Sequence, residues 1–294
     1  MSWRTVVVSK RAKLDLKTGY LVVRSEEETK KINLDEIAVL VIENTAISIT
    51  GCLISALTDK KIKVIFCNEK RDPTCELVSL YGSHDTSAKV RRQIDWSEEM
   101  KACIWTEIIT EKIRKQAEFL DETNHTEEAE LLKKYISEIE FGDASNREGH
   151  AAKVYFNALF GKEFTRSQEC VTNAALNYGY SIILSYFNRE ITAHGYLTQL
   201  GLFHSNMFNH FNFSCDLMEP FRVLVDRCVV KNNFTKFDTE EKHILIDILN
   251  SSVFINNTEQ YLGNAIKLYS RSVFEALNDN DVSNITFYSV KKPG

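Results

Sequence analysis

The sequence predicts an α+β protein, with a small N-terminal β-sheet domain followed by a larger all-α C-terminal domain. Two observations predict this class. Short apolar, often β-branched runs separated by turn signals occupy residues 4–80. From Ser87 onward, apolar residues recur at helical spacing almost to the C-terminus. We therefore expect a β domain at 1–82, a linker at 83–88 and a helical domain at 89–294.

The composition is typical of a soluble globular protein with a large core. The 294 residues are 44% hydrophobic and 26% charged, which suits one large domain or two ordinary ones. A formal net charge of −5 excludes a broadly basic surface, although a local basic stripe would still allow nucleic-acid binding. The N-terminus lacks a signal-peptide pattern and no apolar run reaches transmembrane length. These features predict a cytoplasmic protein without a membrane segment.

The seven cysteines point to a reducing compartment. Their number is odd and no two of them form a C-x-x-C pair. This usage is typical of free thiols rather than of a disulfide framework or a structural zinc site.

The N-terminal strands are predicted by local pattern. Thr5–Val8 is a β-branched run, and Lys17–Gly19 is a hairpin turn between two strands. The continuous apolar run Ile37–Ile42 indicates a strand buried on both faces. Ser48 or Thr50 could cap a short helix. Further strands are expected at 32–34, 62–66 and 77–81. Because this region carries no nucleophile, phosphate loop or metal spacing, a scaffold or dimerisation role is favoured.

The helical region contains one glycine in an unusual place. Gly179 interrupts an apolar helix, and an interior glycine costs about 1 kcal/mol relative to alanine. It therefore indicates close helix packing. A short extended piece is expected at 253–255, and residues 279–294 look like a loose tail. Helices are predicted at 88–94, 98–122, 127–139, 147–160, 163–196, 220–230, 240–250 and 258–278.

Glu148 is the first candidate site residue. Ser145 or Asn146 can cap the helix that follows. Glu148 precedes Tyr155 by seven residues, which places it on the same apolar, inward face of that helix. The helix dipole favours a glutamate in a first turn, but it explains the inward direction less well.

The segment from Gly201 to Arg222 supplies the other candidates. It brings His204, Asp216 and Glu219 together among apolar residues. Asp216 and Glu219 are three apart and share a helix face. Carboxylates with one imidazole suit Mg²⁺ or Mn²⁺, and zinc is disfavoured because no cysteine lies at a supporting spacing. The alternative is an Asp-capped helix start with a salt bridge to Arg222 or Arg227.

These residues resemble the CRISPR-associated integrase family, the catalytic subunit of spacer acquisition, and most closely its type II members. The shared motifs are a glutamate that opens a helix (Glu148), Gly-x-x-His (Gly201–His204) and Asp-x-x-Glu (Asp216–Glu219). The run 176–180 also resembles the family's central helix. The resemblance implies a catalytic C-terminal domain in which Glu148, His204 and Glu219 hold the metal. The long spacing from His204 to Asp216 makes Asp216 a helper rather than a direct ligand.

The resemblance also implies a reaction and partners. The 3′-hydroxyl of a captured DNA fragment would attack a phosphodiester at the edge of a CRISPR repeat, without a covalent protein intermediate. The metal would activate the attacking oxygen and neutralise the phosphate. The family implies a bacterial homodimer that binds double-stranded DNA and joins a small non-catalytic adaptation subunit in a heterohexamer.

Seven basic residues are candidates for contacts with DNA phosphates, although a solvated charge or an ion pair also explains each. Tyr178 and Tyr180 could stack on DNA ends, but their apolar helix favours a place in the core. The basic candidates are Lys89, Arg91, Arg92, Arg147, Lys153, Arg222 and Arg227.

Two other functions fit the same residues. One is a metal-dependent endonuclease or resolvase that cuts branched DNA. The other is a non-catalytic structural subunit in which the acidic cluster only caps helices and forms ion pairs.

Overall fold

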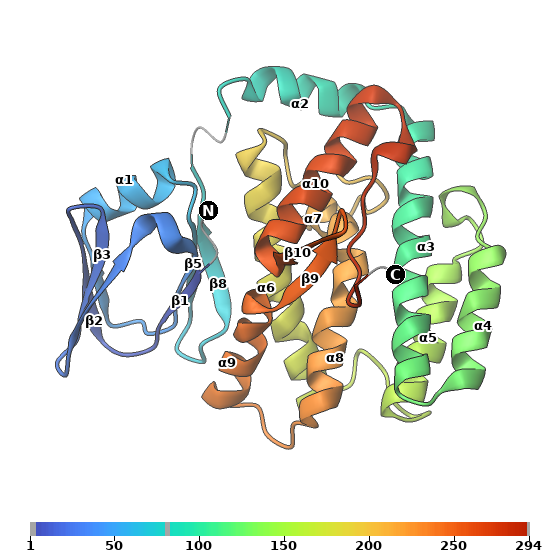
Figure 1. Ribbon diagram of the computed structural model, residues 1–294, viewed down its shortest axis with the longest axis horizontal. Coiled ribbons are helices and arrows are strands. Elements are labelled where there is room, and N and C mark those ends of the chain that lie inside the picture. The colour runs from blue at the N-terminus through green and yellow to red at the C-terminus, as the bar shows by residue number, and fades with distance from the viewer. Residues whose placement is uncertain (1–3, 80–82, 293–294) are drawn as a thin grey trace.

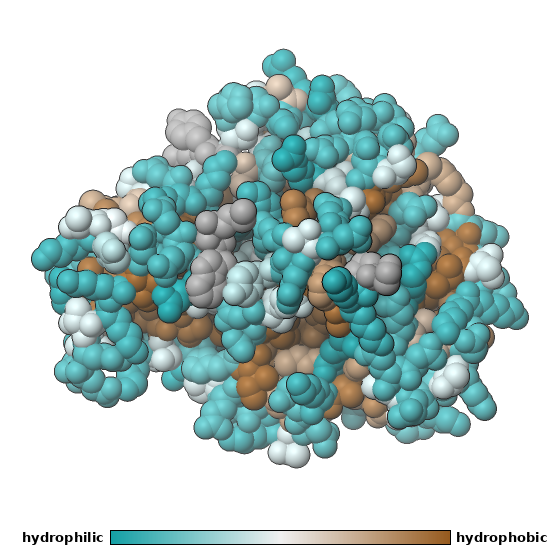
Figure 2. All heavy atoms as spheres, viewed as in Figure 1, coloured by the Kyte–Doolittle hydropathy of each residue, from teal (hydrophilic) through white to brown (hydrophobic). Residues whose placement is uncertain are grey.

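The computed structural model describes residues 4–79 and 83–292. A β part and a larger helical part lie side by side (Figure 1). This arrangement confirms the α+β prediction. Hydrophilic side chains cover most of the face in Figure 2. Among the helices that the structure describes, none has both the length and the apolar character needed to cross a bilayer.

The β part consists of two four-stranded sheets that enclose an apolar core. In the first sheet the buried run Ile37–Ile42 lies between two parallel neighbours, as a continuous apolar run predicts. Thr50 caps the short helix by accepting the N–H of Leu53. The first sheet has the order β1 (Arg4–Val8), β5 (Ile37–Ile42), β7 (Lys63–Cys67), β8 (Pro73–Leu77); the second has the order β4 (Thr29–Asn33), β3 (Tyr20–Arg24), β2 (Ala12–Lys17), β6 (Ile47–Ile49); the helix is α1 (Gly51–Asp59).

The last strand of this part lies earlier than predicted. The sequence predicts a strand at 77–81, whereas β8 ends at Leu77. The side chain of Asn68 accepts the N–H groups of Lys70 and Asp72, so the chain turns at once and β8 pairs back on β7. The end of the predicted strand at residues 80–81, and the predicted domain end at residue 82, lie outside the described residues.

The helical part is built around the long helices α3 and α6. A Cβ atom at Gly179 of α6 would lie 2.4 Å from Val225 Cγ1 of α8, which confirms that close packing requires this glycine. The helices are α2 (Thr86–Asp95), α3 (Glu98–Glu122), α4 (Thr126–Ser137), α5 (Arg147–Phe160), α6 (Val171–Ala193), α7 (Asn212–Met218), α8 (Arg222–Asn232), α9 (Thr239–Asp247) and α10 (Leu262–Asp279). Short 3₁₀ turns are η1 (Leu34–Glu36), η2 (Phe141–Asp143), η3 (Glu219–Phe221), η4 (Ile248–Asn250) and η5 (Val282–Asn284).

The C-terminal part is not all-α, because it contains an antiparallel hairpin of β9 (Ser252–Ile255) and β10 (Thr258–Tyr261). Its two turn residues, Asn256 and Asn257, have φ of 51° and 58°. Consecutive positive φ values characterise the two-residue turns that match strand twist, and asparagine tolerates them. The last helix therefore begins at Leu262 rather than at the predicted Thr258.

The predicted loose tail is anchored over its described length. Phe254 and Ser289 exchange two backbone hydrogen bonds of 2.8 and 2.7 Å. The Tyr288 side chain is buried, and its hydroxyl donates to the Pro220 carbonyl at 2.9 Å. The tail thus packs beside η3, which carries Glu219. The buried ring of Tyr288 and the hydrogen bond of its hydroxyl hold the segment in place, although most of its residues are polar.

The predicted helix 163–196 is shorter, because α6 begins only at Val171. Gly161 ends α5 with φ of 97°, and the following loop reaches α6 through Arg166 and Asn173. This loop borders the candidate site described below.

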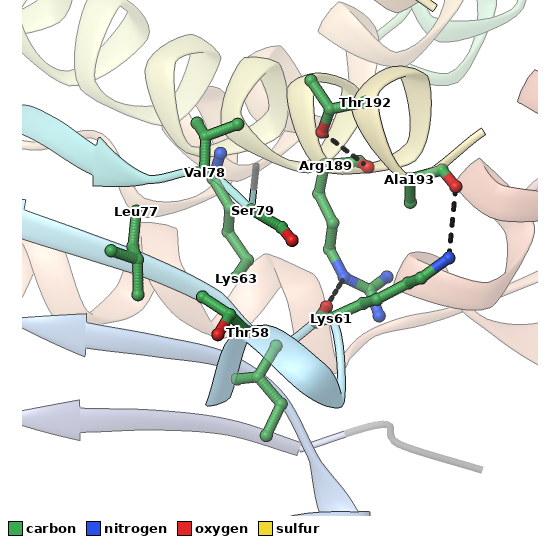
Figure 3. A pocket seen from close by; sticks show the side chains of 10 residues that line it. Thr58, Lys61, Lys63, Leu77, Val78, Ser79, Arg189, Thr192 and Ala193 are labelled. Atoms are coloured by element: carbon green, nitrogen blue, oxygen red, sulfur yellow. Dashed lines mark hydrogen bonds between the residues drawn. The ribbon is translucent and has the colours of Figure 1, made fainter. Parts of the chain in front are cut away.

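The β part contacts the C-terminal end of α6. Figure 3 shows Arg189 Nε donating to the Lys61 carbonyl at 2.7 Å, while Lys61 Nζ donates to the Ala193 carbonyl at 3.3 Å. These residues line a small pocket that contains none of the candidate site residues.

Candidate active site

Glu148 stands in the first turn of α5, at a doubly capped helix start. The Asn146 side chain accepts the Gly149 N–H at 3.3 Å. The Asp143 carboxylate accepts the N–H groups of Arg147 at 2.7 Å and Glu148 at 3.1 Å. These bonds satisfy N–H groups that a helix start leaves unpaired, and they hold Glu148 in position.

The Glu148 carboxylate meets Glu219 at a buried ammonium group. Lys112 Nζ of α3 donates to Glu148 Oε1 and, at 2.5 Å, to Glu219 Oε2. The side chains of Lys112 and Glu219 are 7% and 6% exposed. Burial opposes the charge on Lys112, but the Glu219 and Glu148 carboxylates outweigh it and raise the pKa of the ammonium. Three distant segments therefore converge on one cation position.

Lys112 was absent from the sequence-based prediction. It continues the apolar stripe of Ile104 and Ile108 at a spacing of four residues, so it faces inward with them. A lysine on such a stripe needs an anionic partner, and this signal could have identified it.

Glu219 is held from a second side by Arg222, whose Nε donates to Glu219 Oε1 at 2.9 Å. Burial works against ionisation of Glu219, but the charges of Arg222 and Lys112 outweigh it and lower the pKa to about 2. Glu219 is therefore an anion at neutral pH, with one oxygen toward each cation.

His204 is positioned by Asp216, which is fully buried. The Asp216 carboxylate accepts the backbone N–H groups of Leu202 at 2.6 Å, Phe203 at 3.1 Å and His204 at 3.2 Å. It also bonds His204 Nδ1 at 2.5 Å. With the proton on Nδ1, the other ring nitrogen, Nε2, keeps a lone pair for a ligand.

Gly201 is required by this loop. A Cβ atom there would lie 2.4 Å from the His204 carbonyl oxygen and 2.7 Å from Asp216 Oδ2. The glycine of the Gly-x-x-His motif thus lets the backbone close around the Asp216 carboxylate.

The pKa values of the His204–Asp216 pair are both shifted upward. The hydrogen bond to Asp216 raises the pKa of His204, and burial opposes this effect. Burial raises the pKa of Asp216, and the hydrogen bond from His204 opposes that rise. Both shifts keep a proton on the pair, in the hydrogen bond between His204 Nδ1 and the Asp216 carboxylate.

A metal site is only partly assembled. Among residues 4–79 and 83–292, no three His, Cys, Asp or Glu side chains form a group that could hold an ion. Glu148 and Glu219 share Lys112, whereas His204 opens onto a neighbouring pocket of about 430 Å³. The two carboxylates nevertheless already hold a cation between them. Two carboxylates and an imidazole also suit a hard divalent ion, so the residues fit such a metal in chemistry and charge.

A cavity of about 220 Å³ is lined by Lys112, Glu148 and Glu219. Asp226 also lines it and accepts hydrogen bonds from the hydroxyls of Tyr155, at 3.0 Å, and Tyr180. Burial raises the pKa of Asp226 to about 6, although the two tyrosine hydroxyls oppose this shift. The cavity is also lined by Gln116, Ala152, Phe156, Arg166, Tyr180 and Arg222.

The two central tyrosines belong to the core, as favoured from the sequence. Tyr178 and Tyr180 are 4% and 7% exposed. The Tyr178 ring packs edge-on against Phe237, and the Tyr180 hydroxyl is bound to Asp226.

The seven basic residues predicted to contact DNA fall into two groups, those with an acidic side chain close by and those without one. Arg147, Arg222 and Arg227 pair with Glu138, Glu219 and Glu122, and Lys89 lies 3.9 Å from Asp85. Arg91, Arg92 and Lys153 are exposed and make no ion pair with the residues that the structure describes. Among the seven predicted residues, these last three are the ones that the described structure leaves without an ion pair and so free to bind phosphates.

Comparisons with known proteins agree on one family. The family model "CRISPR associated protein Cas1" matches residues 5–260. The chain is 36% identical over 230 residues to "CRISPR-associated endonuclease Cas1" of Neisseria meningitidis serogroup C (strain 8013), covering 78% of this chain and 76% of that protein.

Two solved structures share the fold. A chain of the "Cas6-RT-Cas1--Cas2 complex" aligns with TM-score 0.72 and 17% identity, covering 99% of this chain. This chain spans only 36% of that longer one. "Casposase bound to integration product" aligns with TM-score 0.72 and 16% identity, covering 96% of this chain and 93% of that one.

Proposed function

The chain belongs to the family of the CRISPR-associated protein Cas1, and we propose that it is a divalent-metal-dependent DNA integrase that inserts spacers at the ends of a CRISPR repeat. One observation carries the proposal: the carboxylates of Glu148 and Glu219, from distant segments, converge on one buried cation position. His204, with Nδ1 bound to Asp216, lies on the adjoining loop.

Glu148, Glu219 and Nε2 of His204 would hold Mg²⁺ or Mn²⁺. When bound, such an ion would activate the attacking oxygen and neutralise charge on the phosphate. Asp216 acts as the helper, because it orients the imidazole and closes the loop that carries it. Arg222 keeps one oxygen of Glu219 engaged and thereby orients the other.

The reaction is a transesterification. The 3′-hydroxyl oxygen of the incoming fragment loses its proton to solvent and forms a new bond to phosphorus. The bond from phosphorus to the 3′-oxygen of the target strand breaks, and this oxygen takes up a proton from solvent and leaves as a 3′-hydroxyl. Among the residues that line the cavity, Tyr180 is the one whose side chain has a hydroxyl that could act as a nucleophile. It donates to Asp226, and burial raises its pKa well above the usual value. This arrangement supports direct attack by DNA without a covalent protein intermediate.

We also propose the assembly. A structural neighbour is a complex that contains Cas2, and the β part carries none of the candidate site residues. Both points support a homodimer that binds double-stranded DNA and a small non-catalytic adaptation subunit in a heterohexamer. The β part would then serve as scaffold.

A strand-transfer assay tests the function. The protein and its small partner are mixed with Mn²⁺, a labelled DNA fragment and a repeat-bearing plasmid. We expect the label to join the plasmid at a repeat end. A fragment that lacks its 3′-hydroxyl is the matched control and should not join.

The second candidate, a metal-dependent endonuclease acting on branched DNA, is favoured by the name of the Neisseria relative. Cutting of branched DNA without any joining in this assay would favour it over the integrase. The third, a non-catalytic subunit, predicts that Glu148→Ala and His204→Ala lower stability without abolishing a metal-dependent reaction.

A further inference from the structure

Arg166 lies on the wall of the cavity that contains Glu148 and Glu219. We propose that its guanidinium binds a backbone phosphate of the DNA strand that enters this cavity, next to the reacting phosphate. The inference rests on the proposed function, since it assigns a substrate contact for the same site. Arg166 was not among the basic residues singled out from the sequence.

The guanidinium is held in a fixed pose by α6. Its Nη1 donates to Asn173 Oδ1, and its Nη2 donates to Asn177 Oδ1 at 2.6 Å. The two asparagines are four residues apart and so lie on one face of the helix. The Asn173 amide in turn donates to the carbonyls of Thr165 and Gln168, both at 2.8 Å. Little side-chain entropy therefore remains to be lost when Arg166 binds a ligand.

Aromatic rings flank the same group. The Arg166 guanidinium lies 5.3 Å from the Tyr180 ring centroid and 5.6 Å from that of Phe156. Arginine stacks well on aromatic rings, and such stacking leaves the N–H groups in the plane of the guanidinium free to bind a ligand.

The charge of Arg166 is not neutralised. Of the cations that line the cavity, Lys112 pairs with Glu148 and Glu219, and Arg222 pairs with Glu219. Arg166 makes no ion pair with any carboxylate of the described chain. The nearby Asp226 is engaged on both oxygens by the hydroxyls of Tyr155 and Tyr180.

Donor capacity also remains. A guanidinium has five N–H donors, and the bonds to Asn173 and Asn177 use two of them. A half-buried arginine with spare donors and no acid partner, facing a cavity, matches the planar recognition of phosphate oxygens. The DNA backbone supplies such a phosphate on either side of the reacting bond.

The test compares Arg166→Gln with Arg271→Gln, a control whose exposed guanidinium pairs with Glu275 at 2.8 Å on α10. Affinity for a labelled DNA fragment is measured by fluorescence anisotropy over a series of NaCl concentrations, in Mn²⁺ and in EDTA. We expect Arg166→Gln to weaken binding about tenfold and to lower the salt slope by about one. Arg271→Gln should behave as the wild type.

Two further readouts separate a phosphate contact from a structural role. Arg166→Lys should retain the salt slope but not the full affinity, because it keeps the charge and loses the fork. In the joining assay, Arg166→Gln should raise the half-saturating DNA concentration more than it lowers the rate at saturation.

Unchanged affinity and salt slope in a folded Arg166→Gln protein would overturn the inference. If Arg166→Gln fails to fold, Arg166→Lys decides: lower affinity supports the inference and wild-type affinity overturns it. If Arg166 does not bind a phosphate, the wild type should still join DNA. Conversely, failure of the wild type to join DNA would contradict the proposed function even if Arg166 governs binding.

Discussion

Lys112 and Glu219 are 107 residues apart in the chain, yet their side chains form a buried ion pair of 2.5 Å. The same ammonium binds Glu148, so one lysine gathers both predicted carboxylate ligands. Without Lys112, Glu219 would keep Arg222, but Glu148 and Glu219 would lose the cation that they share, which is costly unless another cation takes its place.

Lys112→Met should therefore destabilise the protein in EDTA by about 1–3 kcal/mol, because both carboxylates lose a charged hydrogen-bond partner while Glu219 keeps Arg222. Mn²⁺ should recover part of this loss by occupying the vacated cation position. Urea unfolding with and without Mn²⁺ measures both effects. Lys134→Met, at an exposed pair of 3.7 Å with Glu138, is the control and should change stability little. Equal stability of Lys112→Met and the control would refute this role for Lys112.

Gly201→Ala should slow joining by about 100-fold, with a smaller effect on the fold. The added Cβ would lie 2.4 Å from the His204 carbonyl oxygen, so the loop that carries the imidazole must shift. A displacement of about 1 Å at a reacting group can cost about 100-fold in rate. Single-turnover joining, with the thermal midpoint as control, measures the effect, and a wild-type rate would argue against a role for this loop.

The stability of the protein should depend on pH through Asp226. Its folded pKa of about 6 lies above the usual value of 3.8, so the folded state binds more protons between these values. Stability should fall as pH rises from about 4 to about 6, by about 3 kcal/mol at most. Asp226→Asn should remove this fall. Urea unfolding across the pH range checks it, and an identical pH profile for the variant would exclude Asp226 as the cause.

Glu219 should make the stability of the protein depend on pH in the opposite direction, and at lower pH. Its pKa of about 2 lies below the usual value of 4.5, so its contribution is present above about pH 4.5 and disappears as pH falls through 2. Glu219→Gln should flatten the acid branch of the same unfolding profile and leave the branch assigned to Asp226. Loss of both branches in this variant would mean that the two groups titrate as one coupled unit.

The C-terminal segment should contribute to stability. Tyr288→Phe removes the hydrogen bond to the Pro220 carbonyl and should cost about 1 kcal/mol, whereas Tyr288→Ala empties a buried site and should cost about 3–5 kcal/mol. Thermal unfolding measures both. If neither variant differs from the wild type, the segment is not anchored in solution.

The sequence was most informative where structure follows a local period. The inward direction of Glu148 could be predicted because the fixed repeat of a helix places it on the same face as Tyr155. Gly179 indicated close packing because an interior glycine is costly, and Val225 lies against it.

The remaining features depend on contacts between distant segments. Lys112 finds its two partners 36 and 107 residues away, and no local pattern encodes that meeting. The hairpin at Asn256–Asn257 and the anchored Tyr288 were missed for related reasons. The two hairpin strands are short, and the hairpin and the C-terminal segment hold each other in place through the backbone hydrogen bonds between Phe254 and Ser289.

Glu148 is the residue on which the proposed joining reaction depends most, so the most direct test is the joining rate of Glu148→Gln in Mn²⁺ with a fragment that carries a 3′-hydroxyl. We expect a folded variant that joins at least about 1000-fold more slowly than the wild type, because its carboxamide is a poor ligand for a hard cation. Joining at the wild-type rate would contradict the site.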